Sequence, residues 1–181
     1  TVSRTALGSP QLVNTTTSGL QTNAVVANLA DGRYVVVWEG AGDGDSDGVF
    51  FQRFDANGTK LGGESRINDV TTGRQGSPSV AAVGDNFAIV WSDHSQSASR
   101  VLFRGVSASG VRATFTKTIY TNADNADTTP VITFPADSNS YAVAWRGSQS
   151  DATTDIFTAR VLNTLTSTVT PTVVNTTLTG N

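Results

Sequence analysis

The chain has 181 residues, of which 38% are hydrophobic, enough to bury a core in one compact domain or in a stack of small units. Cysteine is absent, so disulfides, thiol catalysis and zinc–thiolate sites are excluded. The formal net charge is −3 with scattered basic residues, and no apolar run is long enough for a membrane-spanning helix, so we expect neither a nucleic-acid partner nor a membrane span.

Valine and threonine are frequent, glycine occurs 17 times, and no segment has the periodicity of a helix, so an all-β fold is predicted. In chain order, the first predicted element is a strand near the N-terminus. Residues 10–16 read PQLVNTT, and residues 171–177 read PTVVNTT. Both copies align with the end of a longer repeat, so residues 1–20 are predicted to hold one strand more than the repeats need.

A repeat of about 54 residues follows the first strand. Residues 34–38 read YVVVW, residues 87–91 read FAIVW and residues 141–145 read YAVAW. Each is preceded by another apolar run and a turn rich in Gly, Asp, Asn or Ser, and is followed by a polar loop and two further runs. We therefore predict three four-stranded antiparallel units, at about residues 21–74, 75–126 and 127–181, within one repeat domain of residues 21–181.

The YVVVW strand predicts how the units pack. Alternation places its aromatic residues and Val36 on one face and Val35 and Val37 on the other, and both faces are apolar. A strand buried on both faces of a small antiparallel sheet indicates that neighbouring sheets cover it from both sides. The units are therefore expected to stack like the blades of a propeller, with the three tryptophans in the core.

The first unit follows the pattern P-x-V-A-x-L-x-D-G-x-Y-V-V-x-W, then a Gly/Asp loop and V-x-x-x-R-F-D-x-x-G, and residues 24–63 match it best. This pattern resembles the repeats of large secreted bacterial proteins of the adhesin and RTX-associated kind. The resemblance implies propeller-like blades and an extracellular or cell-surface location in a bacterium. It brings no catalytic residues.

The extra strand leads to an expectation of self-association. Three blades are too few to close a propeller ring, and an unpaired sheet edge invites a partner strand. We expect a ring made by two chains, a filament joined by strand donation, or a fragment of a longer array; the alternative is an extra edge strand on the first sheet. The predicted assembly residues are Leu12, Val13, Asn14, Val173, Val174 and Asn175.

Three carboxylates alternate in the loop after the first tryptophan. Asp43, Asp45 and Asp47 precede a glycine, and this D-x-D-x-D-G spacing could enclose Ca²⁺ with hard oxygen ligands. The pattern is incomplete, because Phe54 stands at the twelfth position, where an EF-hand has a bidentate Glu. Calcium is therefore a candidate cofactor, and a solvated acidic loop is the alternative.

The polar loops after the three tryptophans are expected to emerge on a common rim, which is a natural binding surface. Their side chains could bond to sugar hydroxyls, as in a lectin; the alternative is that they only keep the surface soluble. The predicted rim residues are Asp93, His94, Gln96, Gln149 and Asp151.

No catalytic motif is apparent. The only histidine is His94, and Asp93 cannot orient it, because adjacent strand residues face opposite sides. A glycosidase built from two carboxylates distant in sequence stays open. The main prediction is a non-enzymatic, extracellular structural protein that assembles with copies of itself. The alternative is a carbohydrate-binding or adhesin module that contacts surface glycans through the loops after the tryptophans.

Overall fold

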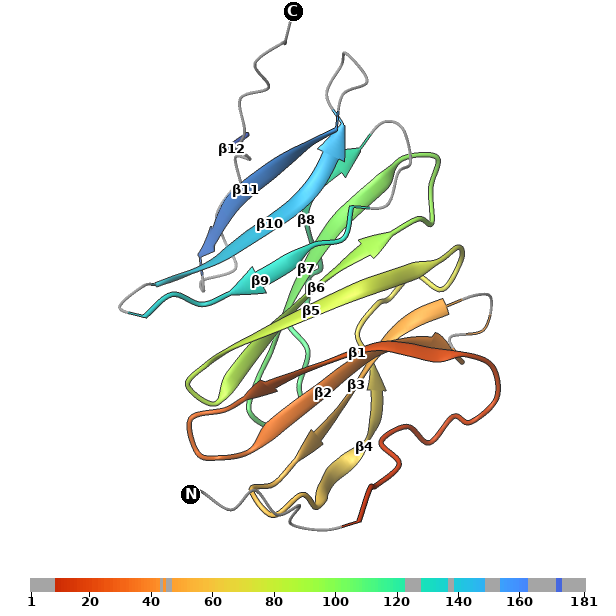
Figure 1. Ribbon diagram of the computed structural model, residues 1–181, viewed down its shortest axis with the longest axis vertical. Helices are drawn as coiled ribbons and strands as arrows, with labels where there is room; N and C mark the ends of the chain where they lie inside the picture. Colours follow the sequence, from red (N-terminus) through yellow and green to blue (C-terminus); the bar gives the residue numbers. More distant parts are fainter. Residues whose placement is uncertain are drawn as a thin grey trace, which may run out of the picture.

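The computed structural model describes residues 9–42, 44, 47–122, 128–136, 139–148, 154–162 and 172–173, which contain twelve strands and no helix (Figure 1). The strands form three four-stranded sheets, and every pair of neighbouring strands is antiparallel. The prediction of an all-β chain with three repeated four-stranded units is therefore confirmed.

The strands of each unit pair in chain order, so each unit is a meander. Unit 1 consists of β1 (Gln21–Asn28), β2 (Tyr34–Ala41), β3 (Asp47–Phe54) and β4 (Lys60–Arg66). Unit 2 consists of β5 (Gln75–Val83), β6 (Asn86–Asp93), β7 (Ser99–Val106) and β8 (Lys117–Asn122). Unit 3 consists of β9 (Val131–Thr133), β10 (Ser140–Ser148), β11 (Thr154–Leu162) and β12 (Thr172–Val173).

The turn residues seen in the sequence connect these strands. Between β1 and β2, Gly32 has a φ of 85°, which residues with a side chain rarely adopt, and the Asp31 carboxylate accepts a hydrogen bond from the Arg33 N–H at 3.1 Å. Between β3 and β4, Gly58 has a φ of 86° in the predicted DANG turn. Local turn chemistry therefore determines where the hairpins reverse.

Unit 2 is the middle layer of the stack, as Figure 1 shows. Phe87, Ile89 and Trp91 of β6 belong to the core shared with unit 1, whereas Ala88 and Val90 belong to the core shared with unit 3. Neighbouring units thus cover both faces of the FAIVW strand, in β6. For the YVVVW strand in β2, from which this packing is predicted, only the face with Val35 and Val37 belongs to a core shared with another unit among the described residues. The unit 1 side is completed by Leu29, Val35, Val37, Val49, Phe51 and Ile67, and the unit 3 side by Tyr141, Val143, Trp145, Phe157, Ala159 and Val161.

Among the described residues, no sheet lies against the outer face of unit 1, which is covered differently. Tyr34 and Trp38 stack on aromatic partners in β3, and Trp38 is only 3% exposed. Residues 11–14 lie over this face, with a cavity of about 210 Å³ between them and Trp38. The next residue, Thr15, donates a backbone hydrogen bond to the Glu64 carboxylate of β4 at 2.7 Å.

The predicted N-terminal strand is therefore not observed. Leu12, Val13 and Asn14 are described and belong to no strand, because the segment runs across a sheet face and bonds to a side chain, so its backbone does not join a ladder. The related segment near the C-terminus does pair: Val173 lies in β12 beside β11. Val174 and Asn175 lie outside the described residues.

In the described part of the chain, the three sheets form an open stack and close no ring or barrel, so the propeller arrangement is not confirmed (Figure 1). Within the same residues, no helix has the length and apolar character to cross a membrane.

Candidate functional site

The first strands of the three units, β1, β5 and β9, lie beside one another where the units meet (Figure 1). A cleft of about 470 Å³ runs along them, and each unit contributes to its walls. Its lining residues are Asn23, Ala24, Val25, Arg74, Ser77, Pro78, Thr129, Pro130 and Val131. The repeat thus brings equivalent positions of all three units to one place.

Three of these residues have a left-handed backbone. Asn23, Ser77 and Thr129 have φ values of 53°, 51° and 37°, and no other non-glycine residue in the described segments has a positive φ. The first two lie at shifts of register in the pairing of β1 with β2 and of β5 with β6, which are β-bulges. Such strain persists only where the surroundings hold it, and it gathers at binding and catalytic sites.

A buried carboxylate holds two of the bulges. Glu39, which follows the first tryptophan, is 3% exposed. Its Oε1 accepts hydrogen bonds from Nε and Nη2 of Arg74 at 3.0 and 2.8 Å. Its Oε2 accepts from Nδ2 of Asn23 and from the backbone N–H of Ser77, both at 2.9 Å. One side chain of unit 1 therefore fixes a bulge in each of units 1 and 2.

At the junction of units 2 and 3, the residue after the tryptophan again makes the contact, but through a hydroxyl group in place of a carboxylate. Ser92 follows the second tryptophan, and its hydroxyl lies 2.7 Å from that of Thr128, with both residues fully buried. After the third tryptophan, the backbone N–H of Arg146 donates to the Thr128 carbonyl at 2.9 Å. Each residue after a tryptophan therefore contacts the segment that leads into a first strand.

The chemistry of the cleft favours an uncharged ligand with both polar and apolar surface. Among the described residues, Arg74 is the only charged one that lines the cleft, and that charge is balanced by Glu39. Val131, which is 59% exposed, and the two prolines supply apolar surface, while Asn23 and the hydroxyl residues supply hydrogen bonds. Among the described residues that line the cleft there is no Asp or Glu, and the side chains that they offer are hydrogen-bonding and apolar groups.

The predicted rim residues fall in different places. Asp93 is fully buried and accepts from Nε2 of Gln75 at 3.2 Å and from Nε of Arg100 at 2.8 Å, so its carboxylate holds unit 2 together. His94 donates its backbone N–H to the carbonyl of Arg74 at 2.8 Å, which places the second loop beside the cleft. Gln96 is exposed. Gln149 and Asp151 lie outside the described residues.

The predicted calcium loop is described only in part. Asp47 begins β3 and is half-buried, whereas Asp43 and Asp45 lie outside the described residues. Among the residues that the structure does describe, no three His, Cys, Asp or Glu side chains gather as a metal site would require. Calcium binding stays a prediction.

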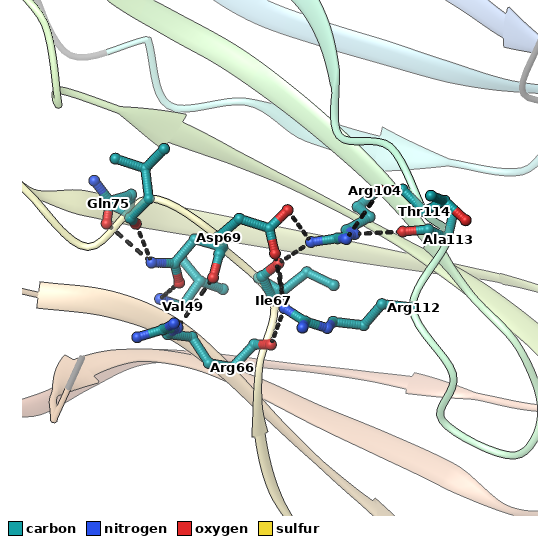
Figure 2. Close-up of polar contacts among 11 residues, drawn as sticks. Val49, Arg66, Ile67, Asp69, Gln75, Arg104, Arg112, Ala113 and Thr114 are labelled. Carbon is teal, nitrogen blue, oxygen red and sulfur yellow. Dashed lines mark hydrogen bonds and ion pairs between the residues drawn. The ribbon is translucent and has the colours of Figure 1, made fainter.

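A polar cluster that sequence reasoning missed joins units 1 and 2 (Figure 2). Arg104 of β7 is 5% exposed, and its Nη1 donates to the carbonyl of Ile67 at 2.9 Å and pairs with Asp69 at 2.8 Å. Arg112 reaches the same carboxylate at 3.2 Å and donates to the Arg66 carbonyl at 2.9 Å. These contacts tie β7 to the connection after β4, and no local pattern links residues so far apart in the chain.

No protein-family model matches the chain, and no curated protein matches it. A similar solved structure is an endo-arabinase from Bacteroides thetaiotaomicron, with a TM-score of 0.57, 13% identity, and coverage of 84% of this chain and 61% of that chain. A family 117 glycoside hydrolase from the marine bacterium Zobellia galactanivorans gives a TM-score of 0.46 and 8% identity over 80% of this chain and 52% of that chain. This chain therefore spans less than two thirds of either structure, and the endo-arabinase match is a likeness of fold.

These findings correct the prediction of a non-enzymatic, self-assembling structural protein related to adhesins and RTX-associated proteins. The fold occurs in an enzyme, the endo-arabinase, and no adhesin family matches. The error has a physical cause. Alternating apolar residues and turn glycines indicate a meander of strands, and this local pattern occurs in unrelated proteins that contain such meanders. The carbohydrate-binding alternative agrees better with the comparisons.

Proposed function

We propose that this protein is a carbohydrate-active protein that binds a neutral glycan in the cleft along β1, β5 and β9. The observation that carries the proposal is the convergence of Asn23, Ser77 and Thr129, three strained polar residues from three units, on one cleft. The likeness of fold to an endo-arabinase supports the same class of ligand.

The surface of the cleft suits a sugar chain. Sugar rings present C–H faces and hydroxyl edges, and the cleft offers exposed Val131 and two prolines beside amide and hydroxyl groups. The balanced charge of Arg74 and Glu39 favours a neutral chain over a uronic acid polymer. The backbone N–H of His94 bonds to the carbonyl of Arg74, a cleft residue, and the loop that begins at His94 would supply further contacts.

Binding can be tested by affinity electrophoresis against soluble arabinan, xylan, β-glucan and galactomannan. We expect retardation by at least one polymer, and we expect Val131→Asp to weaken it by about tenfold or more, or 1.4 kcal/mol, because a charge replaces an apolar contact. The matched control is Val26→Asp, since Val26 is 62% exposed in β1 and does not line the cleft.

Release of reducing sugar from the same four polymers separates binding from hydrolysis. Binding without release supports a binding module, and release that Val131→Asp reduces makes the cleft part of an active site. Absence of retardation by all four polymers, or equal effects of the two substitutions, would contradict the proposal.

Secretion and calcium binding by Asp43, Asp45 and Asp47 stay predictions. The propeller-like arrangement stays a prediction as well, because the described units form an open stack and do not close a ring.

A further inference from the structure

A second cavity lies away from the cleft, beside the tryptophan of unit 2. Its volume is about 170 Å³, below the roughly 300 Å³ at which pockets for drug-sized ligands begin. Its walls come from the connection after β4 and from β5, β6, β7 and β8. The polar residues that matter here are Asn68, Gln75, Trp91, Asp93, Arg100 and Thr116.

Two buried hydrogen-bonding atoms of this cavity have no partner. They are Nε1 of Trp91, a side chain with no exposed surface, and Oγ1 of Thr116. A buried donor without an acceptor destabilises the folded state, so such atoms are normally satisfied by protein, water or ligand. Both atoms belong to residues that line the same cavity.

Comparison with unit 1 shows why the Trp91 donor is left over. There, Nε1 of Trp38 donates to Oε1 of Gln21 at 2.9 Å. Gln75 occupies the equivalent place in unit 2, because each glutamine begins its first strand and pairs with the residue two positions after the tryptophan. In unit 2, however, Oε1 of the glutamine accepts from Nδ2 of Asn68 at 3.0 Å.

The remaining bonds of Gln75 keep it in that position. Its Nε2 donates to the carbonyls of Thr72 and Gly73, both at 3.0 Å, and to Oδ1 of Asp93 at 3.2 Å. A satisfied internal network therefore replaces the bond to the indole, and the Trp91 N–H is left as an unpartnered donor on a residue that lines the cavity.

The charges in the cavity wall are balanced, and Asp69 in that wall pairs with Arg104 at 2.8 Å. Asp93 pairs with Arg100 through Nε at 2.8 Å and through Nη2. The indole can only donate, and a threonine hydroxyl can both donate and accept. The ligand that complements the Trp91 indole and the Thr116 hydroxyl is uncharged and carries at least two hydroxyl oxygens.

We infer that the cavity beside Trp91 is a binding subsite for one sugar ring or a small polyol. One hydroxyl oxygen accepts from Nε1 of Trp91, and another hydroxyl bonds to Oγ1 of Thr116. The inference is independent of the proposed cleft, because the two sets of lining residues do not overlap.

The three tryptophans make a direct test possible, since each gives one indole N–H signal in a nitrogen–proton correlation spectrum. The probes are L-arabinose, D-xylose, D-glucose and glycerol. We expect at least one probe to shift the Trp91 signal saturably, while the Trp38 signal, already bonded to Gln21, stays in place. Thr116→Val should weaken the affinity about fivefold, as expected for one hydrogen bond.

Trp91→Phe removes the donor and keeps most of the apolar side chain, and Trp38→Phe is its matched control. In saturation-transfer measurements on the sugar signals, the first variant should lose binding and the second should keep it. Because Thr116 is only half-buried, Thr116→Val gives a second test if Trp91→Phe fails to fold.

The inference would be overturned by the absence of a saturable shift of the Trp91 signal with any probe, or by equal binding by wild type, Trp91→Phe and Thr116→Val. The cavity would then hold only water. Val131→Asp separates this site from the cleft: it should leave monosaccharide binding unchanged, and loss of monosaccharide binding in that variant would assign it to the cleft instead.

Discussion

At the scale of single residues, short-range hydrogen bonds to carboxylates shape the turns and junctions. Asp55 shows this most simply: its Oδ1 accepts the backbone N–H groups of Thr59 at 2.7 Å and Asn57 at 2.9 Å. The hydrogen bond from Thr59, together with those from Asn57 and Gly58, holds the pKa of the Asp55 carboxyl below its usual 3.8. The charged form is therefore the one that closes the β3–β4 turn.

This pKa gives a pH prediction with a definite sign. The pKa of Asp55 is lower in the folded state than in the unfolded state. Its contribution to the free energy of unfolding is therefore complete above about pH 3.8 and is lost as the pH falls through the lower, folded-state pKa. Asp55→Asn should therefore be less stable than wild type at pH 7, and the gap should narrow below about pH 3.8 in urea unfolding series. Asn57→Ala, in the same turn, removes no titrating group and should give a difference that does not change with pH.

At the scale of elements, the bulged first strands distinguish this sheet stack from a regular one. Ordinary strands have negative φ, and the left-handed region costs a residue with a side chain about 1–2 kcal/mol. Ser77 keeps this conformation because Glu39 accepts its N–H, although Pro78, which follows it, favours an extended backbone at residue 77. The strain is thus held by contacts from another unit.

Ser77→Gly should relieve the strain and keep the N–H bond to Glu39. We expect the free energy of unfolding to rise by up to about 1 kcal/mol, because glycine adopts positive φ without a steric cost. Ala82→Gly in the same strand should lower it by about 0.5–1 kcal/mol. If Ser77→Gly is as destabilising as Ala82→Gly, the backbone at residue 77 is not strained.

At the scale of the whole molecule, unit 2 couples the other two units. Val90 of β6 is fully buried in the core shared with unit 3, and the opposite face of the same strand is buried against unit 1. Val36 of β2, by contrast, is half-buried on the outer face of unit 1. Loss of packing should therefore cost most in the middle layer.

Val90→Ala should lower the free energy of unfolding by about 2 kcal/mol, through lost burial and a residual cavity. The matched substitution Val36→Ala should cost less than about 1 kcal/mol. Chemical denaturation followed by tryptophan fluorescence and by circular dichroism measures both. Two separated transitions in wild type, or equal losses in the two variants, would show that unit 2 does not couple its neighbours.

The sequence by itself determined the class of fold and the three four-stranded units, including the strands around Trp38, Trp91 and Trp145, since a period of two and the turn residues are local properties. The tertiary structure alone decided three other features: the cleft, the Glu39 junction, and the course of residues 11–14 across a sheet face. These depend on which residues of different units come together, and Glu39 and Ser77, which lie in different units, carry no shared local signal. The family resemblance failed for the same reason, because a strand meander has the same local pattern in proteins with different functions.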